Sequence, residues 1–191
     1  DTEGKWQDID NTLTELGSEL STSDARVKFA KKITGNGSLF TLHENNTKIT
    51  FSLNGAIKKT EGKRVDLEIT DDGTELGKLM TLEKLSSKII YEDILDGVDV
   101  EYIVTSNDIK ENIIVKEKKE SYEYSFTLKL NNLTASLSAE GDVLITDASG
   151  VTAYTIPAPV IFDADGNKFL SELEKEYNVS YDENAQGQTF V

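Results

Sequence analysis

The chain has no cysteine, only one histidine and only two prolines among its 191 residues. Without cysteine there is no disulfide framework, no thiolate nucleophile and no cysteine zinc site, and thiol usage cannot indicate the compartment. The single histidine, His43, leaves the commonest general base and metal ligand almost unrepresented. Both prolines stand together in "IPAPV", so no proline-rich linker divides the chain. These absences count against the common types of catalytic and metal centre.

Basic residues and long apolar runs are scarce as well. The chain carries 20 Lys and Arg against 35 Asp and Glu, a formal net charge of −15, which opposes binding to nucleic-acid backbones and anionic membranes. No stretch approaches the ~20 apolar residues that span a bilayer, and "DTEGKWQDID" lacks the basic and apolar parts of a signal peptide. We therefore expect no nucleic-acid partner and no membrane insertion. We expect a single module, 1–191, and the apolar ending "QTFV" favours the interpretation that it is cut from a larger protein.

What the chain has in abundance is period-two alternation of apolar and polar residues, which is typical of half-buried strands. Turn-forming Asn-Gly, Asp-Gly and Glu-Gly pairs punctuate these runs. The pattern predicts an all-β fold, an antiparallel β-sandwich or two abutting small sandwiches. The clearest runs and their expected inward residues are "TKITFSL" (Ile49, Phe51, Leu53), "RVDLEIT" (Val65, Leu67, Ile69), "VDVEYIV" (Val98, Val100, Tyr102, Val104) and "YEYSFTLKL" (Tyr122, Tyr124, Phe126, Leu128, Leu130).

Two segments fit this pattern less well. Around 75–87 the apolar spacing suits a short helix about as well as a strand, and an internal boundary, if there is one, lies near 72–90. In "FLSELEKEYNVSY" both a helix and a strand are compatible with the spacing. We favour a strand there because Val and Tyr become denser toward its end.

The strongest motif for chemistry is "DADGNKFLSELE", residues 163–174. Its spacing matches an EF-hand calcium loop at the ligand positions Asp163, Asp165, Asn167, Ser171 and Glu174, with Leu170 at the aliphatic position. Lys168 stands where the loop requires glycine, and no convincing helices flank the motif. A plain turn is the preferred interpretation, so we assign no metal site.

The other candidate functional residues also have a simpler structural interpretation. His43 in "TLHENN" has no nucleophile-elbow motif near it, and we expect an exposed turn histidine. The acids of "YEDILDGVDVEYIVTSNDIKENIIVKE" are expected on the solvated face of a strand, at Asp99 and Glu101, or around turns. This last group comprises Asp96, Asp108 and Glu111. The run "KEKKE" at 116–120 is predicted to form a hairpin turn.

Exposed aromatic side chains could form a sugar-binding platform. Most aromatics instead follow the inward phase of a strand, and the core is the better interpretation for them. Trp6 and Tyr154 are the two exceptions, and they keep a carbohydrate-binding alternative open. We name no catalytic residue, no metal ligand and no cofactor.

The stretch "IIYEDILDGVDVEYIVTSNDIKENIIV", followed by the segment from "YSFTLKL" to "IPAPVIFDADG", resembles a known family pattern. It is similar to the β-rich region ahead of the YD (Rhs) repeats in secreted, wall-associated, polymorphic-toxin-like proteins of Gram-positive bacteria. The opening "GKWQDIDNTL" is similar to the start of that region. The matching residues are Tyr91, Gly97, Asp99, Glu101, Tyr102, Val104, Lys110, Glu111, Ile113, Val115, Gly141, Asp147, Gly150, Ile156, Pro157, Pro159, Asp163, Ala164 and Gly166.

The resemblance implies an extracellular or cell-surface module of a bacterial protein, one with no catalytic residues of its own. We expect a non-catalytic structural or interaction module that is not an enzyme and that packs against the adjacent YD-repeat region or spaces it from the wall. The alternative is a carbohydrate- or cell-wall-binding module with a cell-wall glycan as partner.

Overall fold

The fold comes from a computed structural model that describes residues 10–67 and 87–162, apart from positions 106, 119 and 121. Beyond these it describes the backbone of three short strands at 168–169, 179–182 and 187–190. In this part of the chain every regular element is a strand, and every strand pairing is antiparallel. The predicted all-β antiparallel sandwich is therefore confirmed.

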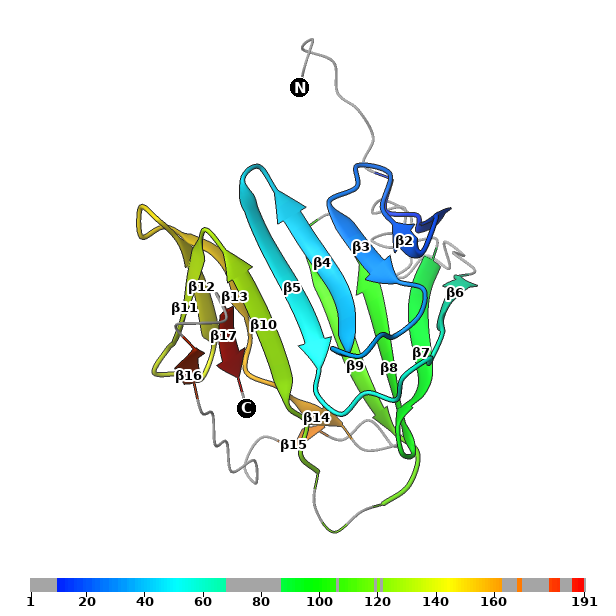
Figure 1. Ribbon diagram of the computed structural model, residues 1–191. Helices are drawn as coiled ribbons and strands as arrows, with labels where there is room; N and C mark the ends of the chain where they lie inside the picture. Colours follow the sequence, from blue (N-terminus) through cyan, green and yellow to red (C-terminus); the bar gives the residue numbers. More distant parts are fainter. Residues whose placement is uncertain are drawn as a thin grey trace, which may run out of the picture.

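Eight strands form the long sheet, in the order β1-β2-β3-β4-β5-β10-β17-β16. Five consecutive N-terminal strands make a meander, and β10 then adds to its edge and pairs with β17 (Figure 1). The bounds are β1 Thr14–Leu16, β2 Glu19–Ser21, β3 Val27–Ala30, β4 Ser38–Glu44, β5 Thr47–Leu53, β10 Phe126–Asn131, β16 Val179–Asp182 and β17 Gly187–Phe190.

The second layer is a four-stranded sheet in the order β6-β7-β8-β9. In Figure 1, β3 and β4 lie in front of β8 and β9. Apolar side chains of both layers form one core. The main core thus joins residues from Leu13 to Leu53 with residues from Ile89 to Val104. The bounds are β6 Gly62–Asp66, β7 Ser87–Leu95, β8 Val98–Val104 and β9 Ile109–Val115.

A three-stranded sheet, β11-β12-β13, packs on the same apolar side of the long sheet, nearer β10. It supplies a second core, in which Ile49, Leu128 and Leu130 meet Val143 and Ile145. A two-stranded pair, β14-β15, completes the described strands. The bounds are β11 Leu133–Leu137, β12 Val143–Asp147, β13 Thr152–Ile156, β14 Ile161–Phe162 and β15 Lys168–Phe169.

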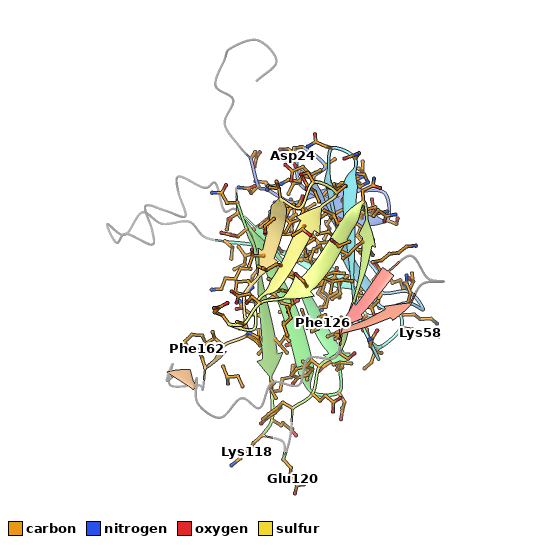
Figure 2. The ribbon with its side chains drawn as sticks, turned by 90° about the vertical axis from the view of Figure 1, so that its left-hand side faces the viewer. Asp24, Lys58, Lys118, Glu120, Phe126 and Phe162 are labelled. Atoms are coloured by element: carbon orange, nitrogen blue, oxygen red, sulfur yellow. The ribbon has the colours of Figure 1, made fainter. Side chains whose placement is uncertain are left out.

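A row of aromatic rings connects the two cores. Phe29 and Phe40 lie 5.4 Å apart between ring centroids, and Phe40 stacks on Phe51 at 4.8 Å. Phe51 then reaches the edge of the Phe126 ring at 6.3 Å, and both rings border both cores. Phe126 lies toward the middle of the molecule in Figure 2. Offset and edge-to-face contacts of this kind add to the stabilisation from burial.

Alternation predicts the inward face of β8 correctly. Val98, Val100, Tyr102 and Val104 are each at most 1% exposed. In β5, Ile49 and Leu53 are buried and Phe51 is half-buried, as expected. Both strands have neighbours on two sides, and one face of each packs into a hydrophobic core.

In β6 the predicted phase is wrong. Val65 is 38% exposed, and the inward positions are Gly62 and Arg64, which lie opposite Tyr91 and Ile89. A Cβ at Gly62 would come within 2.7 Å of both the Ile89 and the Tyr91 side chains, so these two fill the space that an inward side chain of β6 would need. An edge strand can place glycine inward when its neighbour is large.

The strand predicted from Tyr122 to Leu130 begins only at Phe126. Tyr122 is 47% exposed, Tyr124 is half-buried, and Phe126 itself is half-buried. "KEKKE" does not close a hairpin, because β9 and β10 belong to different sheets. It lies on the crossing between the two layers.

Some predictions lie partly or wholly outside the described residues. The short helix over 75–87 and the boundary near 72–90 fall there, except that Ser87 begins β7. In "FLSELEKEYNVSY" residues 168–169 and 179–182 are strands, and 170–178 lie outside. Among the residues that are described, no helix is long and apolar enough to cross a membrane.

Candidate functional site

The acids of the 91–117 stretch lie on the four-stranded sheet, divided between its two faces. Asp99 and Glu101 alternate with the buried residues of β8, so they point away from the main core, as predicted. Glu111 does not bracket a turn: it lies inside β9, directly opposite Tyr102. Asp96 and Asp108 are exposed beside the strand ends. The sheet therefore separates these acids into distinct contacts.

Glu101 is not solvated, which corrects the sequence-based expectation. It is only 8% exposed, and its carboxylate accepts hydrogen bonds from Lys88 Nζ at 2.6 Å and from Asn112 Nδ2 at 2.7 Å. Burial by itself would raise the pKa of Glu101, but the hydrogen bonds from Lys88 and Asn112 outweigh it and hold that pKa below its ordinary value. Lys88 on β7, Glu101 on β8 and Asn112 on β9 thus connect three strands.

The contact of Glu101 with Lys88 and Asn112 predicts that the protein loses stability in acid and that Glu101 accounts for part of this loss. Because the folded-state pKa is depressed, the stabilisation is present above the ordinary carboxyl value of 4.5 and is lost as the pH falls through the folded-state pKa. We expect the unfolding free energy of a Glu101→Gln variant to fall less steeply below pH 4.5 than that of the wild type. Urea unfolding at stepped pH measures this, and equal slopes would contradict it.

Asp99 belongs to a second ionic contact at the turn between β7 and β8. Lys116 Nζ lies 2.6 Å from Asp93 Oδ1 and 2.7 Å from Asp99 Oδ1, and the Asp93 amide donates to Asp99 Oδ1 at 2.7 Å. Asp93 has φ of 48° at the point where the β7-β8 register shifts. Hydrogen bonds to Asp93 and Asp99 raise the pKa of Lys116. One cation therefore serves two carboxylates at this bulge.

Glu111 and Tyr102 form the contact on the core side of the sheet. The Tyr102 hydroxyl donates to Glu111 Oε2 across the β8-β9 pair. Burial, and then the negative charge of Glu111, raise the pKa of the Tyr102 hydroxyl. The phenol thus stays protonated and acts as a donor to the edge strand. Its aromatic ring packs on Phe29 and Phe40.

These three contacts hold strands together and engage Asp93, Asp99, Glu101 and Glu111 in hydrogen bonds. Within the described residues, no three His, Cys, Asp or Glu side chains come close enough to hold a metal ion. His43 is exposed, as expected, but lies in β4 and not in a turn. Tyr154 is half-buried and donates to Glu44 at 2.6 Å. Trp6 and the side chains of the Asp163–Glu174 motif lie outside the described residues.

A different polar surface, which sequence analysis missed, lies on the long sheet. We call it the basic face: the side of β3, β4, β5 and β10 that points away from both cores. Its side chains alternate with core residues along each strand, so the same alternation that predicts the core also identifies them. They are Lys28, Ala30, Ser38, Thr41, His43, Lys48, Thr50, Ser52, Thr127, Lys129 and Asn131, with no Asp or Glu among them. Ser52 is itself buried, at 7% exposed.

Comparison with curated proteins finds related sequences in Bacillus. The chain is 25% identical over 179 residues, 92% of its length, to "tRNA(Glu)-specific nuclease WapA" of Bacillus subtilis subsp. natto and to "tRNA nuclease WapA" of Bacillus subtilis strain 168. It is 24% identical over the same length to "tRNA3(Ser)-specific nuclease WapA" of Bacillus spizizenii. The chain spans 7% of the length of each of these relatives. No protein-family model and no solved structure matches it.

These relatives confirm the coarser part of the resemblance: the chain is similar to wall-associated proteins, which are cell-surface or secreted. They contradict the functional expectation. Relatives named as nucleases are enzymes that act on tRNA, so the expectations of a non-catalytic module, of no enzyme and of no nucleic-acid partner are corrected. The carbohydrate- or wall-binding alternative finds no support. The scarcity of His and Cys in this chain, which matches 7% of a relative's length, says little about the chemistry of the whole relative. The net charge of the chain, in turn, does not reveal a local basic face.

Proposed function

We propose that this chain is part of a secreted, toxin-like tRNA nuclease and serves the cleavage of tRNA. The observation that carries the proposal is the match over 92% of the chain to three Bacillus proteins, each named as a tRNA nuclease. A match of that extent includes both layers of the sandwich. It is therefore a likeness of the whole module, and a single shared motif would not produce it.

The surface chemistry of the chain supports a role beside tRNA. The basic face offers cations and hydroxyl groups on a protein whose charge is otherwise strongly negative. Contacts of this kind engage phosphate groups, which are present on every tRNA irrespective of its sequence. Such a face suits a part of the protein that handles tRNA of any sequence.

The proposal predicts nuclease activity in the complete protein that contains this chain. Incubated with total tRNA, that protein is expected to produce discrete tRNA fragments on a denaturing gel, because two of its three relatives are named for one tRNA species each. Heat-denatured protein is the control. Intact tRNA after incubation with correctly folded complete protein would contradict the proposal.

The finer placement of the chain is also part of the proposal. We propose that the chain lies ahead of YD repeats in the complete protein and forms one module over 1–191; the residues that carry the resemblance support the first part. The main core supports a single module, since it contains residues from both sides of the 72–90 segment. Limited proteolysis of the chain, followed by mass spectrometry of the fragments, tests whether any boundary near 72–90 separates two stable units.

A further inference from the structure

The basic face has a regular layout that the strand pairing fixes. Lys28, Thr41, Thr50 and Lys129 stand opposite one another across β3, β4, β5 and β10. In the adjacent row, His43 lies opposite Lys48. Lys48 and Lys129 are therefore diagonal neighbours, about 7–8 Å apart at the backbone. Three lysines and a histidine thus share one surface of four paired strands.

The charged side chains of this surface are all basic, which distinguishes it from an ordinary solvated sheet face. The outward face of the four-stranded sheet mixes signs, with Lys63 against Glu92 and Lys88 against Glu101. On the long sheet, Glu44 lies in β4 beside His43 but on the core side, where it accepts a hydrogen bond from Tyr154. Glu19 of β2 lies opposite Ala30, beyond the four strands of the face. The chain holds 35 acids and 20 bases, yet this face of four strands carries three lysines and no acid.

The lysines of this face are also free of ion pairs to other described residues. Elsewhere in the described part, Lys31, Lys63, Lys88 and Lys116 each contact a carboxylate. None of the ion pairs found there involves Lys28, Lys48 or Lys129. Lys129 is exposed, and the other two are half-exposed. Their charges are therefore available to a ligand in solution.

The chemistry of the face selects the kind of ligand. Lysine ammonium groups and the hydroxyls of Thr and Ser are typical partners of phosphate oxygens. The face carries no Phe, Tyr or Trp, since the aromatic side chains of β3, β4, β5 and β10 point to the cores. Without aromatic platforms, base stacking contributes little, and contact with the backbone dominates.

We propose that the basic face binds the phosphodiester backbone of RNA, without regard to base sequence. This rests on the proposed function in one respect, because the names of the relatives favour RNA over other polyanions. The expected contribution of the basic face is weak, salt-dependent capture of tRNA that keeps the substrate near the rest of the protein.

The test is fluorescence anisotropy of a labelled tRNA transcript titrated with the 191-residue chain at low ionic strength. The paired variant Lys48→Glu/Lys129→Glu should weaken binding at least tenfold. It should also lower the slope of log K against log salt by about 2, one for each lost phosphate contact. The control Lys110→Glu/Lys118→Glu reverses the same number of charges at exposed positions outside the face, and it should leave both quantities nearly unchanged.

Three results would overturn the inference. The first is a chain that does not bind the transcript, and the second is an equal loss of binding in both variants, which would mean that only total charge matters. The third is light scattering that shows dimers dispersed by the face variant alone, because the face would then bind the acidic surface of a second copy. None of these depends on cleavage, so the inference can fail while the complete protein still cuts tRNA.

Discussion

A Phe29→Ala variant should lose about 3–5 kcal/mol of unfolding free energy. Phe29 is completely buried, and its ring contacts Phe40 at 5.4 Å and Tyr102 at 5.5 Å, so it lies between the two layers of the sandwich. Removing the ring leaves a cavity that neither sheet can fill without distorting its strand pairing. Urea denaturation followed by circular dichroism gives the change.

Two other phenylalanines provide the comparison. Phe126 is half-buried at the start of β10, so its truncation should cost clearly less than that of Phe29. Phe162 is 61% exposed, and Phe162→Ala should change stability by no more than about 0.5 kcal/mol. A loss below about 1 kcal/mol for Phe29→Ala, or equal losses at all three positions, would mean that the two layers do not meet as described.

A Gly62→Ala variant should be destabilised by about 1–3 kcal/mol through overpacking. The added Cβ would lie 2.7 Å from Ile89 Cδ1, 2.7 Å from Tyr91 Cε1 and 2.8 Å from the carbonyl oxygen of Ala30. Tyr91 has little room to move, because it is fully buried and its hydroxyl donates to the Ala30 carbonyl at 2.8 Å. The edge strand β6 must therefore shift away from β7.

Gly35→Ala is the matched control for Gly62. A Cβ at Gly35 would meet only the end of the Lys58 side chain, at 3.9 Å, so stability should stay near that of the wild type. The comparison uses the same substitution in both places and measures the midpoint of urea unfolding. If Gly62→Ala were as stable as Gly35→Ala, the close packing of β6 on β7 would be wrong.

Sequence alternation predicts the fold class and the inward faces of β5 and β8 because those strands have a neighbour on each side and one covered face. Alternation fails at Val65, which lies in an edge strand, and at Tyr122, which precedes the start of a strand. At both places burial depends on partners distant in sequence. The inward place of Gly62 is set by Tyr91, 29 residues later along the chain. Local patterning carries no information about such a contact.

Local patterning is also insufficient to predict the candidate sites. Outward phase alone predicts a solvated Glu101, whereas Lys88 and Asn112 on the flanking strands enclose its carboxylate. The basic face could have been found by sorting the outward residues of each strand by charge, but only strand order shows that β10 lies beside β5. A net charge of −15 obscures such a local concentration of lysine.

Cleavage of tRNA by the complete protein, measured as initial rate against tRNA concentration, is the most direct test of the account. We expect discrete fragments, with a KM that rises at least tenfold in the Lys48→Glu/Lys129→Glu variant and a kcat that does not change. Such a split would show that the basic face captures substrate and does not take part in the chemical step. Absence of cleavage by the folded complete protein would contradict the proposed nuclease function, and an unchanged KM would contradict the role of the basic face.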